Sequence, residues 1–113
     1  MPMPHCIAEH SSDIDVNALL PAIYHGALES GLFESDGSDI KVRSIAYEQY
    51  TTGGERASFI HVAIKVLSGR TGEQKSKLSD RVLHKIEALG LKNLSVTIEV
   101  IDMERLCYAK KIL

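Results

Sequence analysis

The sequence has 113 residues, of which 44% are hydrophobic and 25% are charged, so we expect one soluble globular domain, residues 4–113. The formal net charge of −2 argues against a nucleic-acid-binding protein, which would carry a basic surface. No apolar run is long enough to span a membrane, and the first residues lack the basic and apolar regions of an export signal. We therefore expect a cytoplasmic protein that binds neither nucleic acid nor a membrane.

The cysteines and histidines lack the spacing of a metal site. Cys6 and Cys107 lie at opposite ends of the chain and form neither a disulfide framework nor a zinc motif. The five histidines show no ligand spacing either: His5, His10, His25, His61 and His84. We therefore expect reduced thiols and no metal.

The first half of the chain has the pattern strand, helix, strand. A short apolar stretch at residues 4–8 precedes a polar break at residues 9–13. Apolar residues then recur at helical spacing over residues 16–28, and Gly31 is suited to end that helix. Residues 40–47 alternate between two faces, which predicts a strand.

The second half repeats this order. Residues 60–66 alternate as a strand, and Thr71 with Gln74 forms the pattern of a capping box that starts a helix. The apolar stripe of this helix ends at Gly90, and residues 96–101 alternate as a last strand.

The two halves predict two β-α-β units, about residues 4–47 and 59–102, followed by a tail at residues 103–113. A helix that joins two parallel strands makes a right-handed crossover in each unit. We expect an α+β fold with one four-stranded mixed sheet and both helices on one face. The open face would carry a mixed set of side chains that neighbouring subunits could cover: Lys41, Arg43, Ile45, His61, Ala63 and Lys65.

The repeat and several short segments resemble the tautomerase superfamily, which includes 4-oxalocrotonate tautomerase and macrophage migration inhibitory factor. Residues 68–75 are similar to the Gly-Arg-x-x-Glu-Gln-Lys turn of 4-oxalocrotonate tautomerase. The segment Pro4-His5-Cys6-Ile7 resembles the Pro-His-x-Ile start of the 5-carboxymethyl-2-hydroxymuconate isomerase family, whose single chains also hold two units. Other segments match this family in order and spacing: Leu20-Pro21, Gly31-Leu32-Phe33, Phe59-Ile60-His61 and Gly69-Arg70.

The resemblance implies a cofactor-independent isomerase that assembles as a homotrimer and uses an N-terminal proline as its general base. An α-amino group titrates at about pH 7.7–8.0, and burial or nearby cations lower that pKa, which leaves a neutral base at pH 7. We assign this role to Pro4, because Met3-Pro4-His5 matches the family start. Pro2 is the rival, since it would be exposed by removal of Met1 alone.

The resemblance also implies two arginines and a tyrosine in the site. Arg43 and Arg70 would bind the carboxylates of a small dicarboxylate substrate and stabilise the developing dienolate, and Tyr108 would line the pocket. In the second unit, Ile60 replaces the proline and Thr97 replaces Arg43. We therefore expect one site per subunit, completed by a neighbour.

The expected reaction is the isomerisation of a carboxymethyl hydroxymuconate in aromatic (homoprotocatechuate) degradation. Two alternatives remain at this point: a tautomerase of another 2-hydroxydienoate or keto acid, and a non-catalytic trimeric binding module. We interpret His61 as a structural strand residue.

Overall fold

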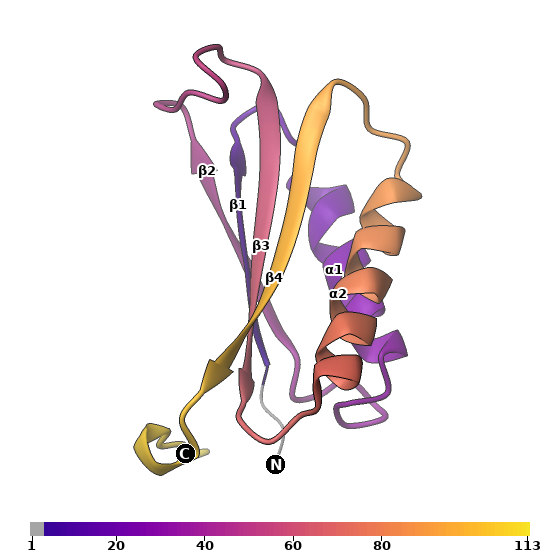
Figure 1. Ribbon diagram of the computed structural model, residues 1–113, viewed down its shortest axis with the longest axis vertical. Coiled ribbons are helices and arrows are strands. Elements are labelled where there is room, and N and C mark those ends of the chain that lie inside the picture. Colours follow the sequence, from indigo (N-terminus) through magenta and orange to yellow (C-terminus); the bar gives the residue numbers. More distant parts are fainter. Residues whose placement is uncertain (1–3) are drawn as a thin grey trace.

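The computed structural model describes residues 4–113, and its secondary structure follows the predicted order (Figure 1). The elements are β1 (His5–Ser11), α1 (Val16–Glu29), β2 (Lys41–Tyr47), β3 (Ser58–Leu67), α2 (Gly72–Glu87), β4 (Leu94–Met103) and the 3-10 helix η1 (Arg105–Cys107). The sheet order is β2-β1-β3-β4. The pairs β1–β2 and β3–β4 are parallel, while β1 and β3 are antiparallel. The predicted α+β fold is confirmed.

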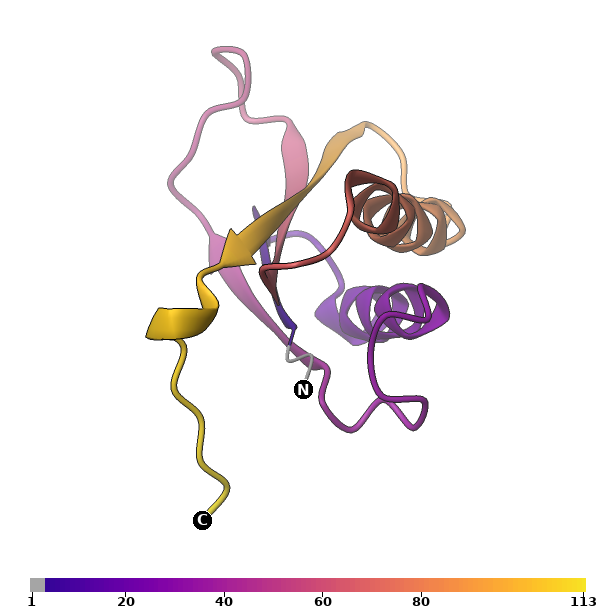
Figure 2. The ribbon, with the colours of Figure 1, turned by 60° about the horizontal axis from the view of Figure 1, so that its bottom comes forward.

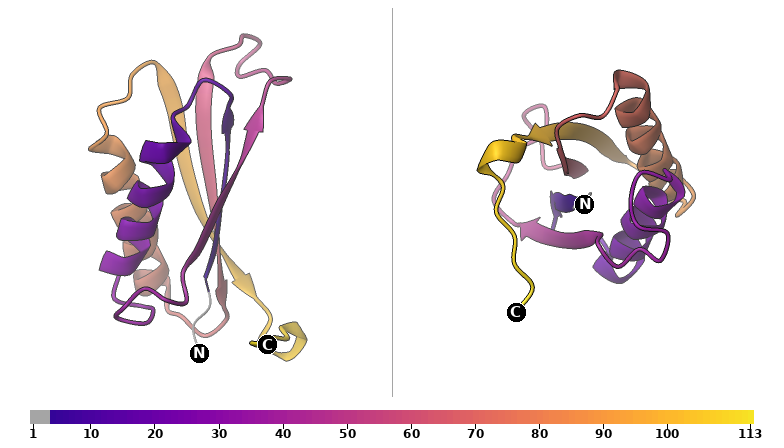
Figure 3. Two further views of the ribbon diagram at one scale, coloured as in Figure 1. Left: turned by 180° about the vertical axis from the view of Figure 1, so that it is seen from behind. Right: turned by 90° about the horizontal axis from the view of Figure 1, so that it is seen from below.

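Both helices cover the same face of the sheet, and the other face is open (Figure 3). Alternate side chains of the two central strands point toward the helices and form the core with the apolar stripes of α1 and α2: Cys6, Ala8, Ile60, Val62, Ile64, Leu19, Ile23, Leu78, Val82 and Ile86. The helices cross very closely at Gly26, where an added Cβ would lie 2.6 Å from the Cα of Val82.

Local signals set the ends of the helices, and all of them except the Asp15 cap were predicted. Thr71 and Gln74 make both bonds of the capping box: the Gln74 N–H donates to Thr71 Oγ1 at 3.1 Å, and the Thr71 N–H donates to Gln74 Oε1 at 2.9 Å. Asp15 caps α1 by accepting from the Asn17 N–H at 2.9 Å. Gly31 and Gly90 follow the two helices with φ of 74° and 73°, values that glycine adopts without strain.

The first strand is longer than the sequence pattern predicted. Residues 9–11, expected as part of a polar break, continue β1 and pair with β2 as far as Tyr47. The backbone is satisfied by this pairing, and His10 and Ser11 each make a side-chain hydrogen bond, while His10 Nε2 is buried without a partner. His10 Nδ1 lies 2.7 Å from the Ser11 carbonyl, and Ser11 Oγ accepts from the Phe59 N–H at 3.2 Å.

Chain direction brings several segments to one end of the sheet. Because β1 and β3 are antiparallel, the beginnings of β1 and β2 lie beside the ends of β3 and β4, where the tail also begins (Figures 1 and 2). We call this end, with Pro4 and the β3–α2 loop, the Pro4 end. Across residues 4–113, no helix has the length and apolar character that a membrane span requires.

Candidate active site

Pro4 is the residue that precedes β1 at the Pro4 end. Its side chain is buried, and its carbonyl accepts a hydrogen bond from the Lys41 N–H at 3.2 Å. This bond ties the entry of β1 to the start of β2. In the printed chain the Pro4 nitrogen is joined to Met3 and is therefore an amide. The rival candidate, Pro2, lies outside the described residues.

A chain of hydrogen-bonding side chains is centred on His5, the residue that follows Pro4. His5 Nδ1 is 3.2 Å from Arg43 Nη1, and His5 Nε2 is 2.9 Å from Tyr108 Oη. The structure thus brings two of the predicted site residues, Arg43 and Tyr108, together through His5. Sequence reasoning did not assign His5 to the site, although it belongs to the Pro-His-x-Ile segment.

The tail reaches His5 because it is fastened to the β3–α2 loop. Arg105 Nε donates to the Ser68 carbonyl at 2.6 Å, and the turn of η1 follows. The rings of Tyr108 and His5 then meet edge to face, with centroids 6.0 Å apart. Arg105 was not singled out from the sequence, because its partner lies 37 residues away.

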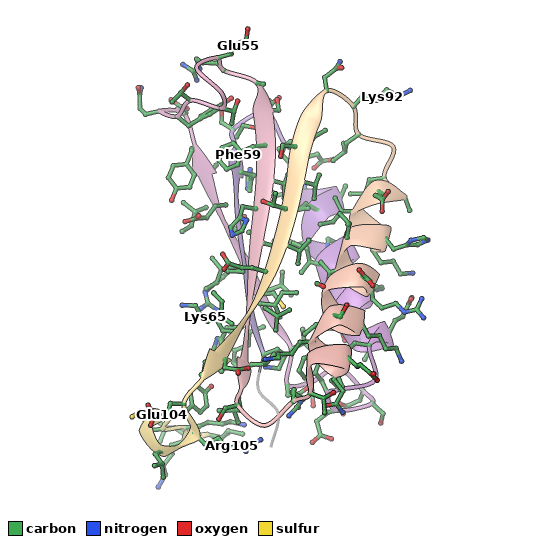
Figure 4. The ribbon with its side chains drawn as sticks, viewed as in Figure 1. Glu55, Phe59, Lys65, Lys92, Glu104 and Arg105 are labelled. Carbon is green, nitrogen blue, oxygen red and sulfur yellow. The ribbon has the colours of Figure 1, made fainter. Side chains whose placement is uncertain are left out.

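Cations surround His5 on the open face of the sheet. Lys41 and Lys65 are the cross-strand partners of His5, and Figure 4 shows Lys65 projecting away from the helices. Burial lowers the pKa of His5, and the positive charges of Arg43, Lys41 and Lys65 lower it further. The site therefore combines a neutral imidazole with a cationic surface, which suits an anionic ligand.

Arg70 has a separate anchor at the same end of the sheet. Its Nη2 donates to the Leu32 carbonyl at 3.1 Å, and its guanidinium lies 6.0 Å from the centroid of the Phe33 ring. Neither contact involves His5, Arg43 or Tyr108. Arg70 is thus held against the loop that follows α1, apart from the Arg43 group.

A cleft of about 530 Å³ opens beside Tyr108. Its lining comes from the α1–β2 connection, the start of β2 and the tail: Glu34, Ser38, Asp39, Lys41, Tyr108, Lys110, Lys111 and Ile112. The Asp39 carboxylate already accepts from the Glu34 N–H. The lysines and the tyrosine hydroxyl can offer charge and hydrogen bonds to a carboxylate. A second hollow of about 480 Å³ is lined by α2 alone and has no converging groups from another element.

The second unit carries a related histidine on the open face. His61 Nδ1 is 2.7 Å from Thr97 Oγ1, and His61 Nε2 is 2.6 Å from Glu99 Oε2. The strand register corrects the predicted equivalence of Thr97 with Arg43. Arg43 pairs with Ile7, which lies three residues after Pro4. The residue three positions after Ile60 is Ala63, and Ala63 pairs with Glu99. Glu99, not Thr97, therefore occupies the position of Arg43.

The described thiols and acidic groups show no sign of metal chemistry. Within residues 4–113, no three His, Cys, Asp or Glu side chains converge as a metal site would require. Cys6 and Cys107 are free, and burial raises the pKa of the Cys6 thiol to about 12. Cys6 is therefore an unreactive core residue.

Comparison with known proteins agrees with the observed fold. No curated protein matches the sequence significantly. Solved structures with the same fold include a 5-carboxymethyl-2-hydroxymuconate isomerase from Deinococcus radiodurans R1, with a TM-score of 0.78, 18% identity, and coverage of 96% of this chain and 89% of that chain. A macrophage migration inhibitory factor-like protein from Entamoeba histolytica has a TM-score of 0.75, 19% identity, and coverage of 96% of both chains. A fused 4-OT wild-type symmetric trimer has a TM-score of 0.73, 13% identity, and coverage of 88% and 87%.

The family itself is shown by sequence. The model of the 5-carboxymethyl-2-hydroxymuconate isomerase family matches residues 4–108, which is nearly the whole chain. The match begins at Pro4 and ends at Tyr108, so it includes the complete Arg43–His5–Tyr108 chain. The protein therefore belongs to the 5-carboxymethyl-2-hydroxymuconate isomerase family.

Proposed function

We propose that this protein is a cofactor-independent isomerase that moves a proton within a 2-hydroxymuconate-type dicarboxylate, most directly 5-carboxymethyl-2-hydroxymuconate. The observation that carries the proposal is the joining of Arg43 and Tyr108 through His5, the residue that follows Pro4 in the chain. A base, a carboxylate-binding cation and a hydroxyl donor are the groups that such a reaction needs, and of Pro4, Arg43 and Tyr108 only Tyr108 lines the neighbouring cleft.

Pro4 acts as the general base when its nitrogen is a free secondary amine. The neutral amine takes the proton from the 2-hydroxyl group of the diene, and the resulting dienolate takes a proton back at carbon to give the 2-oxo isomer. No other reactant is consumed. Arg43 and Arg70 bind the substrate carboxylates and stabilise the dienolate charge, since a guanidinium can hold a carboxylate with two parallel bonds.

We propose that the active form is a cytoplasmic homotrimer of single-domain chains with one site in each subunit. The open face of the sheet is the surface that a neighbouring copy would cover, and the fused 4-OT of the same fold is a symmetric trimer. Light scattering at micromolar concentration should give three times the chain mass. A stable monomer would remove the trimer from the proposal.

The decisive experiment compares a chain that begins at Pro4 with the full chain of 113 residues. Their N-termini are confirmed by mass spectrometry, and ketonisation of 2-hydroxymuconates is followed by ultraviolet absorbance. We call the chain that begins at Pro4 the Pro4 form. Its rate of ketonisation should exceed that of the full chain by roughly 10²–10⁴-fold, because an acylated nitrogen has no lone pair available for a proton. Its activity should also fall as the pH drops and the amine becomes protonated.

Two further variants decide among the alternatives. Pro4→Ala in the short form should lose most of its activity, whereas full activity there would end the proline mechanism. If the full chain is active, Pro2→Ala shows whether Pro2 serves as the base. Turnover of monocarboxylate keto acids in preference to dicarboxylates would indicate another tautomerase, and an inactive trimer that binds dicarboxylates would indicate a binding module.

A further inference from the structure

The protonation state of His5 follows from its two partners. The guanidinium of Arg43 has only donors, so His5 Nδ1, 3.2 Å away, must accept. An accepting Nδ1 has no proton, and a neutral imidazole then carries its proton on Nε2. Nε2–H therefore donates to Tyr108 Oη at 2.9 Å.

The direction of this bond determines what the Tyr108 hydroxyl can do. Its oxygen accepts from His5, so its own proton is not used in that bond. In the opposite tautomer the Tyr108 hydroxyl would donate its proton to His5 Nε2. The Nδ1–H group would then face the Arg43 guanidinium, and two donors would meet without an acceptor. Tyr108 lines the cleft with Lys41, so the hydroxyl proton is available to a ligand oxygen there.

The surroundings of His5 hold the ring neutral. The charged groups that face it are cations on both neighbouring strands, and the tail contributes the tyrosine: Lys41, Arg43, Lys65 and Tyr108. Partial burial and these positive charges lower the His5 pKa. A protonated His5 could not accept from Arg43, so the geometry and the electrostatics agree.

We propose that His5 is a positioning residue: as the Nε2–H tautomer it aligns Arg43 and turns the Tyr108 hydroxyl proton toward an oxygen of the bound substrate. Tyr108 then donates directly to the developing dienolate or to a carboxylate, and His5 acts through it. The kinetic part of this inference rests on the proposed function, whereas the tautomer does not.

Nitrogen-15 NMR of the labelled protein tests the tautomer without any substrate. The His5 resonances are assigned by their loss in His5→Asn. At pH 7.5 we expect the proton of the His5 ring on Nε2 and a lone pair on Nδ1. A proton on Nδ1, or a doubly protonated ring at that pH, would overturn the inference even if the isomerase activity is confirmed.

Two amide replacements separate the two bonds of His5. The side-chain amide of Asn reaches the position of Nδ1, so His5→Asn keeps an acceptor for Arg43 and loses the hydrogen bond to Tyr108. The side-chain amide of Gln reaches the position of Nε2, so His5→Gln keeps a donor for Tyr108 and loses the hydrogen bond to Arg43. Tyr108→Phe is then made in the wild-type, His5→Asn and His5→Gln backgrounds, in the chain that begins at Pro4.

Tyr108→Phe should lower kcat/KM about tenfold in the wild-type and His5→Gln backgrounds, the loss expected for one hydrogen bond, and should change it little in His5→Asn. Equal losses in all three backgrounds would show that His5 does not act through Tyr108.

His25→Asn, an exposed change on α1, is the matched control and should keep wild-type kinetics. Lower melting temperatures with unchanged kinetics would assign His5 a purely structural role and overturn the inference. An inactive wild-type Pro4 form would instead refute the proposed function, and the NMR result would still decide the tautomer.

Discussion

His5 and His61 occupy equivalent places in the two units, and they differ in their partners. Each lies on the first strand of its unit, on the open face of the sheet. Each side chain forms a hydrogen bond with a residue of the second strand that lies two positions beyond the cross-strand partner of the histidine. In the first unit this residue is the cation Arg43, whereas in the second unit it is the carboxylate Glu99.

This difference gives the two units of a repeated scaffold opposite charges at one equivalent position, so only the first unit is suited to an anion. The β-α-β repeat supplies the same backbone geometry twice, and the charge at one position decides what that geometry can bind. Glu99 would repel a carboxylate where Arg43 would attract it. The entry of the strand differs as well: Ile60 is buried within β3 and has an amide nitrogen, so it could not serve as a base.

The largest expected effect comes from removing the cation that distinguishes the two units. Arg43→Ala should lower kcat/KM for dicarboxylates by roughly 10²–10³, the usual loss for one charge-stabilising donor. Glu99→Ala, the matched change at the equivalent position, should leave turnover near the wild-type value. Steady-state kinetics on the Pro4 form measures both. Equal losses, or none in Arg43→Ala, would end the assignment of the anion site to the first unit.

Arg70 should show a smaller kinetic effect together with a loss of stability. Arg70→Ala removes a cation, so kcat/KM should fall by about 10². It also removes the bond to the Leu32 carbonyl and the contact with Phe33, which should lower the free energy of unfolding by about 1 kcal/mol. Arg70→Lys keeps the charge and should recover part of the turnover. Full activity in Arg70→Ala would show a structural residue only.

The sequence predicted the repeat well because periodicity and capping are local properties. The capping box at Thr71 and the glycine after each helix need only neighbouring residues, and both are confirmed. The end of β1 was missed because His10 and Ser11 are polar, and the partner that holds Ser11 in the strand, the Phe59 N–H, lies 48 residues away.

The site was predicted less completely, since its contacts join distant parts of the chain. Arg43 and Tyr108 lie 38 and 103 residues from His5, so their convergence on it has no local signal. Likewise, strand register cannot be read from residue types, which is why Thr97 was taken as the equivalent of Arg43 in place of Glu99. Family resemblance supplied the candidate site residues, and the structure supplied the link between two of them, Arg43 and Tyr108.

The caps of the two helices extend the comparison between the units to stability. Thr71 and Gln74 make two reciprocal bonds on α2, whereas Asp15 makes one side-chain bond on α1. Thr71→Ala should lower the free energy of unfolding by about 1 kcal/mol, and Asp15→Ala by somewhat less. Denaturant unfolding with unchanged m-values measures both losses. A larger loss at Asp15 would show that the reciprocal bond to Gln74 adds nothing.

The smallest expected effect is a dependence of stability on pH that comes from His5. Burial and the charges of Arg43, Lys41 and Lys65 lower its pKa in the folded protein below the ordinary 6.5, which the unfolded chain retains. Between those two pKa values the unfolded state binds more protons, so the free energy of unfolding must decrease as the pH falls from about 6.5. Solvent screening at this partly exposed ring keeps the loss below that of a helix cap. Asp13 and Asp36, whose pKa values are also lowered, affect stability in a separate pH range below their ordinary value of 3.8.

Denaturant unfolding across pH 4.5 to 7.5 measures this effect. The free energy of unfolding should depend less steeply on pH in His5→Asn than in wild type, with Arg43→Ala between them. Parallel slopes for wild type and His5→Asn would show that folding leaves the proton affinity of His5 unchanged.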